Sequence, residues 1–148
     1  MTAGARGRNR SSELPKHADK RHVVYLACPY GDGDARLRRE RFEAATRAAA
    51  QLIKQGYIVY SPITMTHPID AVLGGGKETL GSDYWVDYDE AFMDFCSEMI
   101  ILRAPGWDES RGIKREIEYF AAREKPIRLM DSDGSLHPIN IKNASRGG

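Results

Sequence analysis

The chain is poor in several features that mark large classes of proteins. It has only 2 cysteines, Cys28 and Cys96, and they do not stand at the CxxC spacing of a zinc or redox motif. This argues against a disulfide framework and a metal centre, so we expect two reduced, buried thiols, no metal and no cofactor. No apolar run approaches the roughly 18 residues of a membrane span, and no secretory signal is recognisable. We therefore expect a cytoplasmic protein without a membrane partner.

The chain also lacks an excess of charge of either sign and two common phosphate-binding motifs. Its 22 Lys and Arg residues nearly balance 21 Asp and Glu residues, which leaves a formal net charge of +1. Such a chain has no overall field to attract polymeric nucleic acid, so we expect a small-molecule ligand instead. Neither GxGxxG after the first apolar segment nor GxxxxGKS/T is present. Dinucleotide and ATP binding therefore lose their usual support.

Length and composition predict one folded domain between two tails. Residues 1–21 carry Lys and Arg among Gly, Ser and Asn and have almost nothing to bury. We interpret them as a disordered basic tail, with a weak nucleic-acid-binding arm as the functional alternative. Residues 22–142 are expected to form a single domain. Residues 143–148 are expected to be a flexible tail.

The folded part alternates between β-type and helical patterns. Short apolar runs rich in β-branched residues predict strands at residues 22–27, 57–60, 99–102 and 126–130. A further short element is expected at residues 139–141. Amphipathic spacing predicts helices at residues 36–55, 84–95 and 111–123. Gly56 is expected to be a left-handed cap, and residues 64–81 resemble a mobile flap. The order predicts an α/β fold, with a doubly wound, Rossmann/flavodoxin-like parallel sheet of about four to five strands and helices on both faces.

In such a sheet the loops after neighbouring strands meet at the carboxyl edge, where ligands bind. Pro29 and Tyr30 follow the first strand, His67 follows the second, and Trp107 and Ser110 follow the third. We expect these residues to surround a common crevice. A polar turn that leads into a helix at this edge suits an anion or a sugar.

A helix carboxylate is the strongest candidate for chemistry in that crevice. Ser110 and Gly112 would open the helix, and Glu116 lies about one and a half turns further on, where its side chain could point back toward the crevice. The structural alternative is an ordinary surface glutamate paired with a neighbouring base such as Lys114 or Arg115. Taken alone, the position favours this structural alternative, and the catalytic role of Glu116 depends on the resemblance described next.

Several segments taken together resemble the nucleoside 2-deoxyribosyltransferase superfamily, which includes nucleoside 5′-monophosphate N-glycosidases. The chain is most similar to a bacterial and phage branch of that superfamily. The resemblance extends over most of residues 22–130. The segments that carry it, in order, are Tyr25-Leu26-Ala27-Cys28-Pro29-Tyr30, Asp89, Met99-Ile100-Ile101-Leu102, Ser110-x-Gly112, Glu116 and Ala121 to Pro126.

The resemblance implies roles for individual residues. Glu116 would be the nucleophile and Asp89 its acidic partner, with Asp94 and Asp87 as alternatives for Asp89. Tyr30 would contact the sugar or a catalytic carboxylate, although a tyrosine after a strand is often only packed. The chemistry fits, because a carboxylate beside the anomeric carbon can stabilise or trap an oxocarbenium-like sugar, and a second acid can protonate the leaving base. Relatives build their sites at subunit interfaces, so a homodimer or larger homo-oligomer is expected.

The residue at position 110 indicates which class of substrate is bound. Relatives that act on nucleosides tend to carry an acid at this position, whereas those that act on 5′-monophosphates carry serine. A hydroxyl at a helix N-terminus suits a phosphate, but Ser110 could also be only an N-cap. The expected substrate-binding residues are Ser110, Gly112, Arg111, Pro29, His67 and Trp107, and Trp85 is a second aromatic that could stack on a base or belong to the core.

We therefore expect an N-glycosidase that hydrolyses a nucleoside 5′-monophosphate, preferably a deoxynucleotide, to free base and sugar phosphate. One alternative is a 2-deoxyribosyltransferase that exchanges bases between nucleosides. The other is a non-catalytic nucleotide-binding module.

Overall fold

The computed structural model describes residues 19–31, 34–74, 80 and 82–139. The tail expected at residues 143–148, and all but the last three residues of the tail expected at 1–21, lie outside these ranges. The described elements, in chain order, are β1 (Val23–Ala27), α1 (Ala35–Lys54), β2 (Ile58–Tyr60), α2 (Pro62–Leu73), α3 (Ser82–Phe95), β3 (Glu98–Leu102), the short 3-10 helix η3 (Trp107–Glu109), α4 (Arg111–Ala122), β4 (Ile127–Met130) and β5 (Leu136–Pro138).

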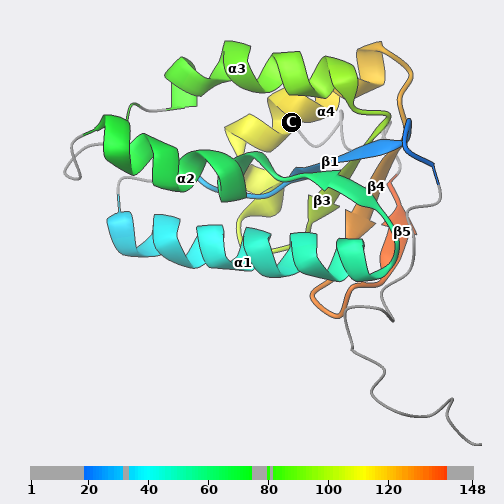
Figure 1. The fold of residues 1–148 in the computed structure, drawn as a ribbon, viewed down its shortest axis with the longest axis horizontal. Helices are drawn as coiled ribbons and strands as arrows, with labels where there is room; N and C mark the ends of the chain where they lie inside the picture. Colours follow the sequence, from blue (N-terminus) through cyan, green and yellow to red (C-terminus); the bar gives the residue numbers. More distant parts are fainter. Residues whose placement is uncertain (1–18, 32–33, 75–79, 81, 140–148) are drawn as a thin grey trace, which may run out of the picture.

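The strands form one sheet of 5 strands in the order β2-β1-β3-β4-β5 (Figure 1). β2, β1, β3 and β4 are parallel, and β5 runs antiparallel to β4. The α/β prediction is therefore confirmed, with one antiparallel edge strand added. β1 pairs with both β2 and β3, so the chain order reverses direction between β1 and β3. Ligands of such sheets bind at the carboxyl ends of the two strands that flank this switch point.

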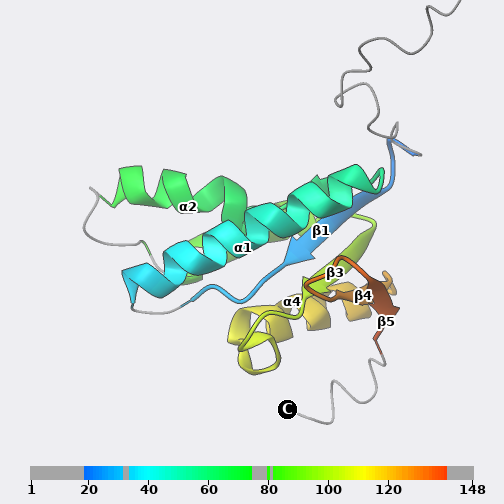
Figure 2. The same cartoon turned by 90° about the horizontal axis from the view of Figure 1, so that it is seen from below.

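Both faces of the sheet are covered, which explains why its central strands are almost continuously apolar. Alternate residues of β1 and β3 pack against α1 on one face and against α3 and α4 on the other. Figure 2 shows α1 and α2 on one side of the sheet and α4 on the other. The first core cluster includes Val24, Leu26, Leu52 and Ile100. The second includes Tyr25, Met93, Ile101 and Phe120.

The prediction of a flap at residues 64–81 is wrong over its first half, because residues Pro62–Leu73 form helix α2. Pro62 stands in the first turn, where backbone N–H groups make no hydrogen bond within the helix, so its missing N–H costs nothing there. Pro68 lies inside the helix, and in the sequence alone this proline suggested that no helix continues through it. The helix continues because tertiary contacts outweigh that local cost: Ile63 is buried, and the buried Asp70 carboxylate accepts hydrogen bonds from Leu80 N and Trp85 Nε1. Residues 75–79 and 81 of the expected flap lie outside the described ranges.

The short fifth element expected at residues 139–141 lies earlier in the chain, as strand β5 at Leu136–Pro138. Residues 131–135 form a tight turn in which Gly134 adopts φ 90°, a conformation that favours glycine. The turn brings β5 back beside β4 earlier than the apolar pattern suggested. Ile139, the source of that pattern, packs against the core beyond the strand, and residues 140–141 lie outside the described ranges.

The remaining elements match the predicted ones within a few residues. Gly56 has φ 98° and follows the end of α1, as expected of a left-handed cap. Cys28 and Cys96 are buried free thiols. Within the ranges given above, no helix combines the length and apolarity needed to cross a bilayer.

A buried ion pair holds the amino ends of the strands together. Glu98 is buried, with 4% of the residue surface exposed. Its Oε1 accepts from His22 Nε2 and Arg128 Nη2, both at 2.8 Å, and its Oε2 accepts from Arg128 Nε at 3.0 Å. Arg128 also donates to the Tyr57 hydroxyl at 3.0 Å. This network lies at the edge of the sheet opposite the predicted crevice and stabilises the scaffold.

Candidate active site

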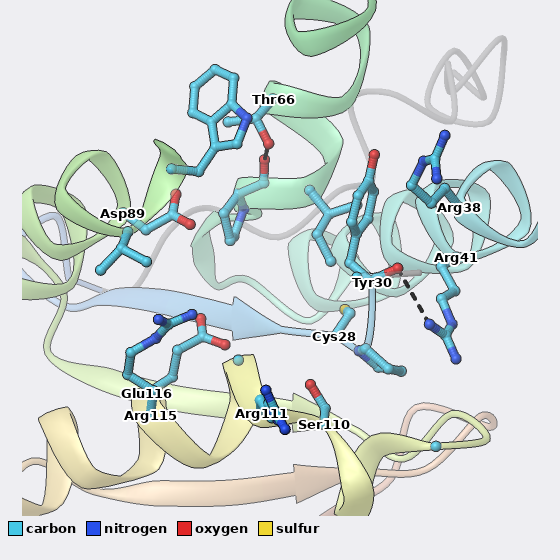
Figure 3. Close-up of a pocket in the computed structure, with 18 of the residues that line it drawn as sticks. Cys28, Tyr30, Arg38, Arg41, Thr66, Asp89, Ser110, Arg111, Arg115 and Glu116 are labelled. Carbon is cyan, nitrogen blue, oxygen red and sulfur yellow. Dashed lines mark hydrogen bonds between the residues drawn. The ribbon is translucent and has the colours of Figure 1, made fainter. Parts of the chain in front are cut away.

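A cavity of about 700 Å³ lies at the carboxyl edge of β1 and β3, where the topology predicts a ligand (Figure 3). Its walls come from the loop after β1, from α1, α2 and α3, and from the segment that runs from Gly106 into α4. Of the residues named from the sequence, the cavity brings together Pro29, Tyr30, Asp89, Ser110, Arg111, Gly112 and Glu116.

The start of α4 positions Ser110 and Glu116 on the cavity wall. Ser110 is the N-cap, and its hydroxyl oxygen accepts a hydrogen bond from Ile113 N at 3.2 Å. The position of a Cβ on Gly112 would lie 3.8 Å from Ser110 Oγ and 4.0 Å from Glu116 Oε1. These are ordinary contact distances, so Gly112 is not required by crowding. They do establish that the hydroxyl and the carboxylate flank the same point.

Glu116 and Asp89 are acids whose protonated forms are favoured by their surroundings. Burial raises the pKa of Glu116 to about 8, and the nearby charge of Asp89 adds to this, while Tyr25 and Arg115 oppose it. Burial also raises the pKa of Asp89 to about 7, against the opposing effect of Arg115. Two carboxyl groups that change protonation near neutral pH within one cavity are typical of acid–base and nucleophilic sites.

The structure distinguishes Asp89 from its two alternatives. Asp94 is exposed on α3, where it accepts a hydrogen bond from the Tyr119 hydroxyl and pairs with Arg123. Asp87 is exposed and does not line the cavity. Asp89 is therefore the one acid of these three that faces Glu116 across the cavity.

Unpaired buried polar atoms gather around the same two acids. Within the described ranges, the buried side-chain polar atoms without a hydrogen-bond partner are Tyr25 Oη, Tyr60 Oη and Asp89 Oδ1. The Tyr25 hydroxyl lies close enough to Glu116 to lower the pKa of that carboxyl, although the contact falls short of normal hydrogen-bond geometry. Burial and the charge of Asp89 raise the pKa of Tyr60. Leaving such groups unpaired typically costs about 1–3 kcal/mol each, so a bound ligand that pairs with them is favoured.

His67 does not line the cavity, contrary to what its loop position suggested, because α2 turns it toward α1. Its Nδ1 lies 2.6 Å from the Tyr30 hydroxyl, and its ring stacks on Phe42 at a centroid distance of 4.4 Å. Burial lowers the pKa of His67, and Arg38 and Arg39 lower it further. His67 therefore holds Tyr30 against the cavity as a neutral partner.

Trp107 also lies away from the cavity lining. It opens η3 and packs against the core cluster beneath α4. Trp85 does line the cavity, where Asp70 fixes its indole N–H at 2.9 Å. Of the two tryptophans, Trp85 is thus the one placed to contact a ligand.

Sequence reasoning missed several cavity residues, above all the arginines Arg38 and Arg41 of α1 and Arg115 of α4. Arg38 and Arg41 belong to a run of charged residues that is typical of a solvated helix face. Their spacing of three residues, which places both on one face of a helix near the predicted crevice, is the signal that could have identified them. Tyr25 was noted as part of a motif without a role. In the described part of the chain, His, Cys, Asp and Glu side chains do not form a group of three or more that could hold a metal ion.

Comparison with protein-family models identifies a family. The model described as "Domain of unknown function (DUF1937)" matches residues 22–132, which include every described residue of the cavity. No curated protein matches the chain.

Proposed function

We propose that this chain, which belongs to the DUF1937 family, hydrolyses the N-glycosidic bond of a nucleoside 5′-monophosphate, preferably a deoxynucleotide. The observation that carries the proposal is the pair of carboxyl groups, Glu116 and Asp89, that face one cavity from two helices with pKa values near neutrality. Glycosyl transfer requires such a pair, one group to attack or stabilise the anomeric carbon and one to handle the proton of the leaving group.

The reaction has two steps in which Glu116 is consumed and restored. In the first, its carboxylate attacks C1′, the C1′–N bond breaks, and the base leaves with the bonding electron pair and takes up a proton from Asp89. In the second, water attacks C1′ and gives its proton to Asp89, and the ester to Glu116 breaks. The net change is one nucleotide and one water converted to free base and sugar phosphate.

The pair carries one proton near neutral pH, as the reaction requires, and in the free protein the higher pKa of Glu116 favours that proton on Glu116. With pKa values of about 7 for Asp89 and about 8 for Glu116, the cavity holds one proton over the two groups near pH 7.5. Because the groups interact, these values belong to the pair, and the proton resides on either acid. The form with Glu116 ionised and Asp89 protonated is the reactive one. A positive charge developing at C1′ in the bound substrate favours that form, because it stabilises the ionised Glu116.

Ser110 and the first turn of α4 support a phosphorylated substrate. Ser110 Oγ already accepts from Ile113 N, so its own O–H remains free to donate. The unpaired backbone N–H groups of the helix start and their dipole favour an anion at this point. Arg111, the next residue, also lines the cavity. We expect Trp85, which also lines the cavity, to stack on the base.

The proposal is tested by incubating the protein with a panel of 5′-monophosphates and the matched nucleosides and measuring released base by chromatography. We expect release from at least one monophosphate. Glu116→Gln should reduce it by roughly three orders of magnitude or more, since the nucleophile is lost. Glu118→Gln changes the same charge on the exposed side of α4 and should alter the rate by less than about twofold.

Release by Glu116→Gln within a few-fold of the parent would overturn the mechanism. Tight binding of a monophosphate without any release of base would instead favour the nucleotide-binding module. Transfer to a second base uses the same Glu116 intermediate with a base in place of water. Mixtures of a substrate with a second free base distinguish transfer from hydrolysis, because only transfer yields a new nucleoside or nucleotide.

A further inference from the structure

Arg41 of α1 occupies a fixed position between the two loops that form the switch point of the sheet. Its Nη1 donates to the backbone carbonyl of Tyr30, after β1, at 3.2 Å. Its Nη2 lies 3.3 Å from the position that a Cβ on Gly106, after β3, would occupy. Gly106 has φ 90°, so the loop after β3 passes close to the guanidinium in a conformation suited to glycine. Arg41 is therefore fixed by a hydrogen bond to one loop and lies close to the backbone of the other.

The charge of Arg41 has no counterion within the described residues. Arg41 is half-buried in the cavity wall, and no carboxylate there forms an ion pair with it. Two acids other than Glu116 and Asp89 line the cavity. Asp70 is already engaged by Leu80 N and Trp85 Nε1, and Glu109 is exposed. A guanidinium keeps its charge at all physiological pH values, so a half-buried one without a counterion favours an anion from outside.

Arg38 adds to the positive field at the same place. It lies three residues before Arg41, on the same face of α1, and also lines the cavity. Its charge opposes the rise in the pKa of Tyr30 and helps to lower the pKa of His67, so it acts on the cavity wall from close range. Figure 3 shows Arg38 and Arg41 together on one side of the cavity, with Asp89 and Glu116 on the other.

We infer that Arg41, assisted by Arg38, is the anion subsite of this cavity and binds the phosphate of the substrate between α1 and the start of α4. The inference rests on the proposed function and deepens it, because it assigns the residues that select a phosphorylated substrate. The planar fork of Arg41 presents paired N–H donors, which match two oxygens of a phosphate. Phosphate at this end leaves the sugar between the two groups of charges, with C1′ toward Glu116.

The test measures binding, so that it does not depend on turnover. Titration calorimetry of the full chain with inorganic phosphate, and with 2′-deoxyadenosine and its 5′-monophosphate as a matched pair, gives the three affinities. Arg41→Gln keeps a donor for the Tyr30 carbonyl and removes the charge. We expect it to weaken binding of phosphate and of the monophosphate by on the order of tenfold or more, and to leave nucleoside binding within about twofold. Arg41→Lys, which keeps the charge but not the fork, should fall between the parent and Arg41→Gln.

Arg47→Gln is the matched control, since Arg47 is an exposed arginine of the same helix that does not line the cavity. It should bind phosphate as the parent does. Equal loss of nucleoside and monophosphate affinity in Arg41→Gln would overturn the inference, because a residue that only clamps the two loops affects both ligands alike. Phosphate affinity unchanged in Arg41→Gln would overturn it as well. If that variant does not fold, Arg41→Lys decides by the same comparison.

Failure of this inference and failure of the proposed function give different results. If the parent binds phosphate through Arg41 but releases no base, the subsite inference stands and the proposed glycosidase activity fails. If the parent releases base and Arg41→Gln still prefers monophosphates to nucleosides as strongly as the parent does, the proposed glycosidase activity stands and the subsite inference fails.

Discussion

Replacing the proposed nucleophile should make the protein more stable at alkaline pH while it removes activity. The pKa of Glu116 is raised by burial from 4.5 to about 8. Between these values the folded state holds a proton that the unfolded chain has released, so the free energy of unfolding decreases as pH rises. Above pH 8 the folded state also loses the proton, and the decrease stops. Glu116→Gln removes this cost because glutamine is never ionised.

The size of the effect follows from the same shift. Each pKa unit corresponds to about 1.4 kcal/mol, which gives an upper limit of roughly 5 kcal/mol at pH 8. Water in the open cavity screens part of this, so we expect a gain of about 1–3 kcal/mol. For a domain of this size, 1 kcal/mol shifts the melting temperature by roughly 2–8 °C. At pH 5 Glu116 is protonated in the folded parent and the destabilisation is small, so the two proteins should unfold at nearly the same temperature.

Thermal unfolding of the parent and Glu116→Gln at pH 5 and pH 8, followed by circular dichroism, measures the difference. Glu118→Gln is the control, because Glu118 lies exposed on the same helix. We expect its melting temperature to track that of the parent at both pH values. A difference between Glu116→Gln and the parent that is the same at pH 5 and pH 8, or a lower melting temperature of the variant at pH 8, would refute the reasoning.

Four further outcomes are expected. Ser110→Asp should lower the ratio of monophosphate to nucleoside turnover by on the order of tenfold or more, measured as kcat/KM, because it places a carboxylate where the phosphate binds. In the parent, kcat/KM for base release should fall below about pH 7 and above about pH 8, the pKa values of Asp89 and Glu116, since the reactive pair holds one proton. Glu98→Ala should lower the free energy of unfolding by roughly 2–4 kcal/mol in denaturant titrations, because Arg128 loses its buried partner. Light scattering should give a homodimer or larger, with the apolar side chains exposed on α2 and α3 as the covered surface; a monomer active at working concentration would contradict this.

The fold was predictable because its signals are periodic and local. The apolar runs at residues 23–27 and 98–102 read as buried strands, and they occupy the centre of the sheet. α2 was missed because Pro68 and the glycines that follow are local signals of a break, whereas the helix is maintained by nonlocal contacts. The buried carboxylate of Asp70 reaches residues 10 and 15 positions away, and no pattern along the chain reports this.

The candidate site was most directly predictable where one segment carries it. Ser110, Gly112 and Glu116 lie within a single turn and helix, so their spacing along the chain fixes their relation in space. The spacing of Arg38 and Arg41 indicates only a shared helix face, and the position of Arg41 between two loops depends on tertiary packing. His67 illustrates the opposite error. Its place after a strand predicted a cavity residue, but the helix that replaces the expected loop turns it toward Tyr30 and Phe42.

Two acidic environments on one sheet show where the protein is built for stability and where it is not. At the amino edge, Glu98 is buried, and both of its carboxylate oxygens are paired by His22 and Arg128. At the carboxyl edge, Asp89 keeps a buried oxygen without a partner, and the Tyr25 hydroxyl beside Glu116 is unpaired as well. A neighbouring arginine or histidine could have satisfied Asp89, as it does Glu98. Because unpaired buried groups cost stability, their concentration at the switch point is the pattern expected where a ligand completes the hydrogen bonds. The same acids that destabilise the free protein are those assigned to the reaction.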